Sequence, residues 1–438
     1  MIDLTPPALA SSKDAPRADL SAARIRRRYR AEARFRLYGI AAISTALAML
    51  AVLLGTIVWS GASAFLQTEI ALEVPLEAAA IDPDGTRDPA ILSRVNYRKI
   101  VRAALRAQFP EVSGRRNNRE LQKIISSGAD LTLRNHVLDN PDQIGTTPVI
   151  WFKSSADIDQ FKKGAIPRDV PEADRRVSDA QIGWFDKLDA GGLVRRSFNT
   201  TFFTTGDSRE PEQAGIWGAV VGSALTLFVT LILSFPLGVM AAVYLEEFAP
   251  KNRWTTLIEV NINNLAAVPS IVFGLLGLAI FLNFFGLPRS APLVGGLVLA
   301  LMTLPTVIIA SRAALTSVPP SIRQAALGVG ASPLQAVLHH VLPLAMPGVL
   351  TGTIIGMARA LGETAPLLMI GMVAFIVDIP RGFTDAATAL PVQVFLWADA
   401  PERAFAERTS AAIMVLLGFL ILMNLAAVIL RRKFERRW

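Results

Sequence analysis

Five stretches of this sequence contain no Asp, Glu, Lys or Arg, and each is long enough to cross a bilayer as a helix, which takes ~20 residues. They are Leu37–Thr68, Ala214–Leu245, Val260–Pro288, Ser290–Ser311 and Thr409–Leu430. A sixth apolar stretch, about Pro347–Val377, is interrupted by Arg359 and Glu363. Only 18% of the 438 residues are charged, against roughly 25% in soluble domains. The sequence therefore predicts an all-α polytopic membrane protein with six transmembrane helices.

The basic residues gather at the two ends of the chain. Residues 1–36 carry nine Lys/Arg against four Asp/Glu, and residues 431–438 carry five against one. Positive charge beside a span favours the cytoplasmic side. We expect two basic cytoplasmic tails, 1–36 and 431–438, with residues 37–60 as the first span. The tails adjoin apolar runs instead of being interleaved with aromatic residues, so we expect membrane lipid as their partner and no nucleic acid.

The first apolar run also invites comparison with a signal peptide, because Ala62-Ser63-Ala64 fits a small-x-small cleavage site. The preceding 36 residues and the 23-residue apolar stretch Leu37–Trp59 both exceed what such a peptide usually has. An uncleaved membrane anchor is the better interpretation; the family resemblance described below implies that the membrane is the bacterial cytoplasmic (inner) membrane.

Residues 61–213 have the composition of a soluble surface, with 21 basic and 22 acidic residues. Helical periodicity is seen around Ile91–Ala107 and Glu120–Val137, and strand-like runs at Pro148–Lys153 and Val194–Thr204. The sequence predicts a small α+β extracytoplasmic domain between the first and second spans, of unknown role. The motifs described below all lie beyond residue 213, so we expect this domain to be dispensable for their function.

Several classes of chemistry are excluded or disfavoured by composition. The chain has no Cys and only three His, which argues against thiolate metal sites, and we expect no metal and no catalytic residue. It also has no Gly-Lys dipeptide, so a phosphate-cradling loop of the Gly-x4-Gly-Lys-Ser/Thr type is absent. If ATP drives this protein, another subunit must hydrolyse it.

A short motif lies between the fourth and fifth spans, in residues 318–347. Gln324-Ala325-Ala326 is followed by Gly330 and then by Leu342-Pro343. We expect a short helix from Ser321 to Gly328 with a small-residue face of Ala325 and Ala326, a turn at Gly330 that tolerates positive φ, and a new helix at Pro333. The pattern resembles the coupling signature of ABC-transporter permeases, although Gln324 stands where that family usually has Glu.

Four further strings resemble one family, the PstA-type permease of the high-affinity phosphate ABC importer, in a long subgroup with an N-terminal extension. The strings are Tyr244–Ala249, Val268–Leu275, Arg359–Leu368 and Ala389–Phe395. The resemblance covers residues 214–430 and implies a type I ABC-importer permease that translocates inorganic phosphate by alternating access. It implies as partners a second, PstC-type permease, an ATPase dimer that uses ATP and Mg, and a periplasmic phosphate-binding protein. The chain itself would bind no cofactor, and Gln324, Ala325, Ala326 and Gly330 would couple it to the ATPase.

Arg359 and Glu363 are the charged pair of the fifth span, four residues apart and so on one helical face. An intramembrane charge is costly and usually functional. Arg359 is predicted to donate to a phosphate oxygen, which its planar guanidinium suits, while Glu363 keeps binding weak enough for release. Thr364 and Ser270 are placed in the same pathway. A structural ion pair remains the alternative.

Pro269, Gly362 and Pro366 are the predicted hinge residues. Pro366 removes the donor for the Gly362 carbonyl and predicts a kink. Pro269 predicts a kink in the third span, or a break that presents backbone N–H groups to an anion. Glycines at 348, 352 and 356 predict a close-packing face.

Three other functions stay open. A permease for another oxyanion, such as sulfate or molybdate, would share the fold and the coupling segment. A membrane receptor with an external sensing domain is less consistent, because no connection on the cytoplasmic side is long enough for an output domain. A membrane enzyme would need a nucleophile, base and orienting group that the fifth span lacks.

Overall fold

The computed structural model describes residues 22–434. The outer parts of the two predicted basic tails, 1–21 and 435–438, lie outside the described residues. The chain forms two compact units, residues 1–56 and 57–438. In the first unit, residues 22–56 belong to one continuous helix, α1 (Ala22–Ala62). Large apolar side chains along this helix are exposed, among them Leu47 and Val52, as expected of a helix that meets lipid.

In the second unit, the residues between α1 and the bundle form a small α+β domain. Its strands are β1 (Leu66–Glu73), β2 (Val149–Lys153) and β3 (Val194–Phe198). Its helices are α2 (Ala78–Ile81), α3 (Pro89–Leu92), α4 (Tyr97–Gln108), α5 (Arg115–Gln122), α6 (Ala129–Asp139), α7 (Ala156–Lys162), α8 (Asp179–Ala190) and α9 (Thr200–Thr204).

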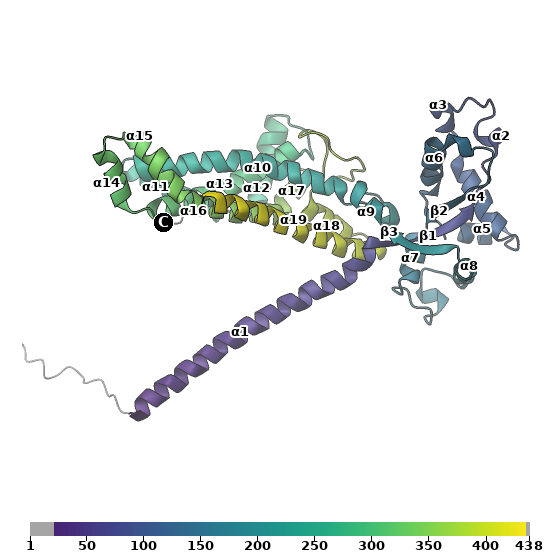
Figure 1. Cartoon of the computed structure of the whole chain (residues 1–438), viewed down its shortest axis with the longest axis horizontal. Helices are drawn as coiled ribbons and strands as arrows, with labels where there is room; N and C mark the ends of the chain where they lie inside the picture. The colour runs from purple at the N-terminus through teal and green to yellow at the C-terminus, as the bar shows by residue number, and fades with distance from the viewer. Residues whose placement is uncertain (1–21, 435–438) are drawn as a thin grey trace, which may run out of the picture. The chain divides into compact units, whose positions relative to one another are not determined.

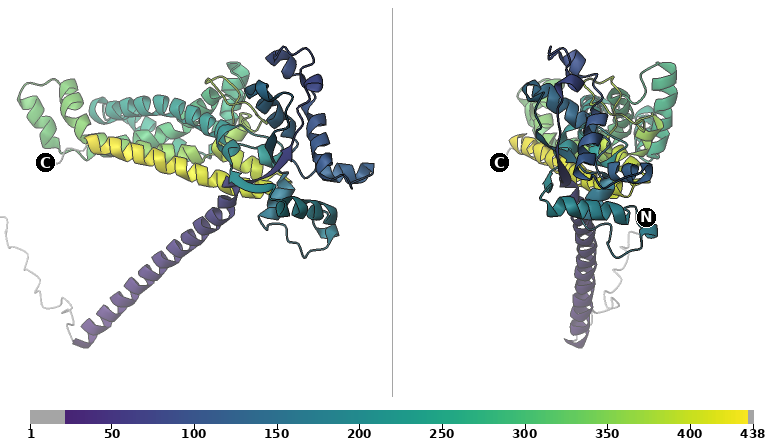
Figure 2. Two further views of the ribbon diagram at one scale, coloured as in Figure 1. Left: turned by 45° about the vertical axis from the view of Figure 1, so that its right-hand side comes forward. Right: turned by 90° about the vertical axis from the view of Figure 1, so that its right-hand side faces the viewer.

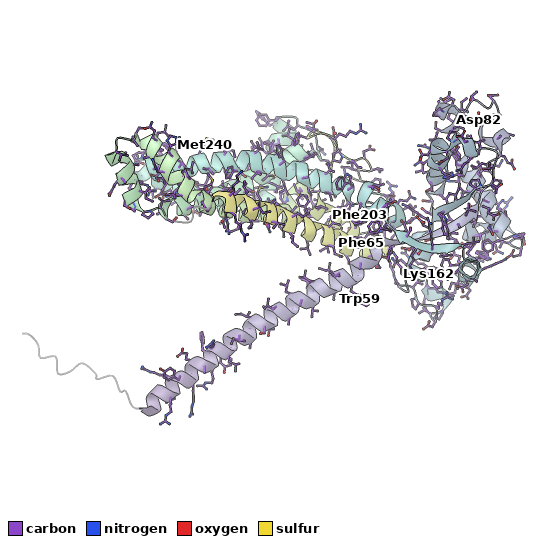
Figure 3. The ribbon with its side chains drawn as sticks, viewed as in Figure 1. Trp59, Phe65, Asp82, Lys162, Phe203 and Met240 are labelled. Carbon is purple, nitrogen blue, oxygen red and sulfur yellow. The ribbon has the colours of Figure 1, made fainter. Side chains whose placement is uncertain are left out.

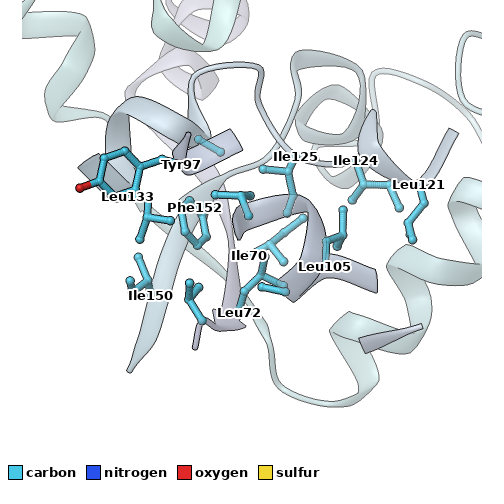
Figure 4. Close-up of a cluster of buried hydrophobic side chains, with 14 of the residues drawn as sticks. Ile70, Leu72, Tyr97, Leu105, Leu121, Ile124, Ile125, Leu133, Ile150 and Phe152 are labelled. Carbon is cyan, nitrogen blue, oxygen red and sulfur yellow. The ribbon is translucent and has the colours of Figure 1, made fainter. Parts of the chain in front are cut away.

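The three strands form an antiparallel sheet with β1 in the centre. Ile70 of β1 pairs with Phe152 of β2 and with Val194 of β3. The sheet packs on helical side chains to form a core that includes Leu105, Leu133 and the fully buried Phe152 (Figure 4). The predicted α+β class is therefore correct. The sequence analysis did not predict β1, and it extended the third strand to Thr204, where the structure places helix α9.

The rest of the second unit is a helical bundle (Figure 1). Its helices are α10 (Trp217–Val243), α11 (Arg253–Ala266), α12 (Ser270–Gly277), α13 (Pro292–Thr316), α14 (Pro320–Gly328), α15 (Pro333–Ala336), α16 (Leu342–Gly362), α17 (Ala365–Met369), α18 (Leu390–Ala398) and α19 (Ala404–Phe434). Three π-helical segments, Tyr244–Phe248, Leu278–Phe284 and Val337–Val341, extend α10, α12 and α15. In the left view of Figure 2 the yellow α19 runs along the green and teal helices of the bundle.

Glycines bring the central helices α10, α13 and α16 close together. A Cβ on Gly356 would lie 2.9 Å from Cγ2 of Thr303, and one on Gly348 would lie 2.7 Å from the Cβ of Ala314. A Cβ on Gly296 would likewise lie 2.9 Å from the carbonyl oxygen of Thr226 in α10. Contacts this short leave no room for a side chain, so the predicted glycine face of the fifth span is a helix-packing face.

Five helices among the described residues are long and apolar enough to span a membrane, and a bent pair makes up to six. The bent pair is α11 with α12 and its π-helical extension, which meet at 98°. The third span is thus broken at Pro269, which is a larger change than a kink. The fifth span also differs from the prediction, because α16 ends at Gly362 instead of continuing to Val377.

The α+β domain is joined to the start of α19 by buried polar contacts. Lys163 Nζ lies 2.6 Å from Asp159 Oδ2 and 2.8 Å from Glu407 Oε1, and each of these side chains is at most 10% exposed. Arg408 donates to the carbonyl oxygen of Ala64 at 3.3 Å. Phe65 and Phe203 stack beside this junction (Figure 3). These contacts make the domain an integral part of the second unit.

Candidate transport and coupling sites

Arg359 lies in the last turn of α16, and Glu363 is the residue that caps this helix. The Arg359 Nε lies 3.5 Å from Glu363 Oε1, and the two side chains are 49% and 19% exposed. Glu363 has an extended ψ of 123°, so the helix ends at this residue, but its side chain still meets Arg359 as the four-residue spacing predicts. The pair is loose, and within residues 22–434 the Arg359 guanidinium has no other hydrogen bond or ion pair, so most of its donors can bind a ligand.

The packing of α16 on α13 fixes the level of Arg359 along the bundle. Gly356 packs against Thr303, which is close to the centre of α13 (Pro292–Thr316). Arg359 is three residues further on, a rise of ~4.5 Å in an α-helix. The backbone of Arg359 therefore lies near the level of the middle of α13, where an uncompensated charge would be costly in a membrane.

Two chain breaks meet beside this pair. The backbone after Gly362 leaves the helix, and Pro366 occupies the first turn of the new short helix α17, where a missing N–H costs nothing. Pro366 thus opens a helix, and the predicted kink in a continuous helix is not found. A Cβ on Gly274 of α12 would lie 2.7 Å from the Pro366 Cα. This contact joins α17 to the broken third span.

The remaining predicted pathway residues lie around the same contact. Ser270 is the first residue of α12, one turn before Gly274 and on the same helical face. Thr364 directly precedes α17, and its carbonyl oxygen accepts hydrogen bonds from the N–H groups of Leu367 and Leu368 at 3.1 and 3.0 Å. Both side chains are partly buried. The contact of Gly274 with Pro366 therefore brings α12 and α17 together, seven residues after Arg359 in the chain.

The coupling segment has the predicted local structure. Helix α14 ends at Gly328, Gly330 has φ +90°, and α15 begins at Pro333 behind a capping box formed by Ser332 and Gln335. Each feature follows from local sequence, because Gly tolerates positive φ and Ser caps the following turn.

The exposed face of the coupling segment differs from the predicted one. Gln324 and Ala325 are exposed, but Ala326 is only 5% exposed and packs inside the chain. Apolar side chains take its place on the surface, with Leu327 48% and Val329 85% exposed. A docking surface here would therefore consist of Gln324, Ala325 and these two apolar residues.

Ion pairs close to the coupling segment were not predicted. Arg323 bonds Glu247 at 2.6 Å, and Arg312 bonds Glu259 at 2.8 Å. The sequence carries a signal for them, since Glu246 and Glu247 directly follow a long apolar run.

A cleft of about 530 Å³ lies where the α+β domain meets the start of α19. Glu212 lines it and is 3% exposed, and burial raises the pKa of this carboxyl although Ser126 donates to it at 2.7 Å. Nearby, burial lowers the pKa of Lys153 to about 8, with the Arg408 charge acting in the same direction. None of the predicted transport residues lines this cleft.

Comparison with known proteins gives the family. Residues 234–438 match a family model described as the binding-protein-dependent transport system inner membrane component, and residues 22–172 match a domain of unknown function (DUF3333). The first match confirms the predicted fold class, a type I ABC-importer permease. The DUF3333 match covers α1 and about half of the α+β domain, and fits the N-terminal extension.

Individual relatives agree. The chain is 31% identical over 255 residues to the phosphate transport system permease protein PstA 1 of Mycobacterium tuberculosis (strain CDC 1551 / Oshkosh), covering 58% of this chain and 81% of that protein. It is 33% identical over 232 residues to PstA of Mycobacterium leprae (strain TN), covering 52% and 74%. It is 35% identical over 188 residues to the probable ABC transporter permease protein YqgI of Bacillus subtilis (strain 168), covering 43% of this chain and 63%, less than two thirds, of that relative.

Among solved structures, an inward-facing MetNI methionine ABC transporter matches 51% of this chain and 95% of its own, at 16% identity and a TM-score of 0.39. The sequence relatives carry the assignment, because the aligned region spans about three quarters or more of the two mycobacterial PstA proteins at over 30% identity. The chain is a multi-pass inner-membrane protein and belongs to the PstA family of ABC-transporter permeases.

Proposed function

We propose that this chain is the membrane-spanning permease subunit of an ATP-driven importer and that it passes inorganic phosphate across the cytoplasmic membrane by alternating access. The observation that carries the proposal is the half-exposed Arg359 near the level of the middle of α13, close to the helix break after Gly362. A guanidinium there suits a tetrahedral oxyanion. The relatives named phosphate permeases supply the choice of phosphate over other oxyanions.

Arg359 and Glu363 would act in opposition on the passing anion. Arg359 donates charge-assisted hydrogen bonds to phosphate oxygens. Glu363, held 3.5 Å away, repels the anion and competes for the same guanidinium. Binding stays weak enough for release, which a transport site requires. Half of the Arg359 surface is open in one chain, so a second permease, of PstC type, would complete the pathway.

The coupling segment would dock on a separate ATPase dimer, which binds ATP and Mg. Gln324 and Ala325 lie exposed together with Leu327 and Val329, a surface suited to an apolar groove. Gly330 holds the turn behind it. A periplasmic phosphate-binding protein would deliver substrate at the opposite end of the bundle.

The proposed topology places both chain termini in the cytoplasm and the α+β domain outside. Because the chain has no native Cys, single cysteines report on each side. An impermeant maleimide on intact cells should label Ser127→Cys in the α+β domain and leave Lys433→Cys unlabelled until the membrane is permeabilised. Labelling of Lys433→Cys in intact cells would contradict this orientation.

Co-purification tests the proposed function against a receptor. A tagged chain purified in mild detergent should bring with it an ATPase subunit and a second permease. The complex should then support phosphate uptake that sulfate and molybdate do not inhibit. Purification of the chain alone would contradict the importer proposal, and inhibition by sulfate would assign it to another oxyanion.

A further inference from the structure

One side chain joins the coupling helix α14 to the spanning helices. The Arg323 Nη2 donates to Glu247 Oε1 at 2.6 Å, and its Nε lies 3.1 and 3.0 Å from the two oxygens of the same carboxylate. Glu247 belongs to the π-helical end of α10. The guanidinium therefore binds the carboxylate through two nitrogens, an arrangement that Lys cannot form.

The same guanidinium also reaches the end of α13. Its Nη1 donates to the Val318 carbonyl at 2.7 Å, and its Nη2 donates to the Leu315 carbonyl at 2.9 Å. The side chains of Arg323 and Glu247 are only 23% and 9% exposed. Three elements, the ends of α10 and α13 and the coupling helix α14, thus meet at one half-buried cation.

A π-helical turn shapes the acceptor. The Ala249 N–H bonds to the Tyr244 carbonyl at 2.8 Å, five residues back, and such turns are frequent at functional sites. The two successive carboxylates of this turn bind different arginines. Glu247 binds Arg323 of α14, whereas Glu246 lies 3.4 Å from Arg312 of α13.

The Arg312 pair provides a matched comparison within the same region. Arg312 joins α13 to α10 and, through Glu259, to α11. Within residues 22–434, the Arg312 guanidinium bonds Glu246 and Glu259 and no residue of α14. Arg312 is 27% exposed, close to the exposure of Arg323. The two arginines share location, burial and partner type, but only Arg323 belongs to the coupling helix.

We propose that Arg323 is a positioning residue that transmits displacement of α14 to α10 and α13. Gln324, Ala325 and Leu327 of α14 face outward, whereas Ile322 and Ala326 make apolar contacts inside the chain. Arg323 adds directed hydrogen bonds to the ends of α10 and α13, which can pass on a movement of α14. The inference rests on the proposed function, in which α14 receives the ATPase.

The test uses the purified complex with its ATPase in liposomes and measures phosphate taken up per ATP hydrolysed. Arg323→Lys keeps the positive charge but loses the planar guanidinium fork. Because charge-assisted hydrogen bonds are lost, the phosphate taken up per ATP should fall by about tenfold. The rate of ATP hydrolysis should stay within about twofold of wild type. Glu247→Gln keeps the side-chain shape and should lower the ratio in the same direction. The control Arg312→Lys should leave it within about twofold.

The outcomes separate the explanations. A wild-type ratio in both Arg323→Lys and Glu247→Gln would overturn the inference, as would an equal loss in Arg312→Lys. Loss of the ATPase from the Arg323→Lys complex alone would also overturn it, because Arg323 would then serve docking. If the wild-type complex hydrolyses ATP without any phosphate uptake, the proposed function itself fails, and this inference fails with it.

Discussion

Removal of the Arg359 charge, alone and together with that of Glu363, distinguishes a substrate-binding residue from a structural ion pair. Arg359→Gln removes the cation and leaves Glu363, 19% exposed, as an unpaired carboxylate. The double variant Arg359→Gln/Glu363→Gln removes both charges and relieves that cost. The two explanations therefore differ in what the double variant does.

The geometry of the Arg359–Glu363 pair sets the expected sizes of the effects on stability and on the transport rate. The Arg359 Nε and Glu363 Oε1 atoms are 3.5 Å apart, beyond the ~2.7–2.9 Å of a charge-assisted hydrogen bond, so this contact itself contributes little to stability. A charge-assisted hydrogen bond to substrate contributes about 1.5–3 kcal/mol, which corresponds to roughly 10- to 150-fold in rate at low phosphate. The functional effect is thus expected to exceed the structural one.

The assay is initial phosphate uptake at low phosphate, divided by the amount of membrane-inserted chain. If Arg359 binds phosphate, the single variant nearly abolishes uptake, and the double variant inserts normally but stays at least about tenfold below wild type. Uptake by Arg359→Lys should lie between that of Arg359→Gln and that of wild type, because the lysine keeps the positive charge but lacks the planar donor fork. Recovery of the double variant to near the wild-type rate would refute the substrate role and leave a packing pair.

Three further changes test other parts of the account. Gly330 has φ +90°, so Gly330→Val should impose strain of about 1–3 kcal/mol and abolish uptake with normal insertion; unchanged ATPase stimulation would show that the turn does not couple. Gly296→Val would place its Cβ 2.5 Å from Val229 Cγ1 and should destabilise the bundle by about 1–3 kcal/mol, seen as a lower Tm in detergent; an unchanged Tm would contradict this packing. The pKa of Lys153 is about 8 against an ordinary 10.5, so the unfolded chain binds more protons between these values and stability should rise with pH through that window; Lys153→Met should remove this rise, and an identical pH profile in both proteins would show that Lys153 is not the cause.

Local features of the coupling segment were predictable from the sequence. Gly330, Pro333 and the helix that ends at Gly328 depend on the residue type at each position, and the structure confirms them. The spanning helices were also predictable from local sequence, because an uninterrupted apolar run has few stable alternatives to a helix in a membrane.

Features that depend on distant partners were not predictable. Strand β1 contains Gln, Glu, Ala and Leu, which favour helices in isolation, and its two neighbouring strands override that preference. A break at Pro269 is one of the two outcomes that the sequence predicts, but its 98° angle and the close packing of Gly274 against Pro366 involve residues far apart in the chain. Arg323 and Glu247 are 76 residues apart, so no local pattern joins them.

The α+β domain changes one expectation. Its dispensability followed from the position of the motifs, but Lys163 and Glu407 form a buried ion pair across its junction with α19. Deletion of the domain would leave Glu407 and Arg408 of α19 without these partners, and removing one partner of a buried pair is strongly destabilising. We therefore expect that a chain without residues 61–213 is destabilised at the start of α19.

The most direct measurement is transport by the purified complex in liposomes that contain ATP on the coupling-segment side and receive radiolabelled phosphate with its binding protein on the other. The account predicts phosphate accumulation that requires ATP hydrolysis, is lost in Arg359→Gln, and is unaffected by excess sulfate. Accumulation without ATP, or equal uptake by wild type and Arg359→Gln, would contradict it.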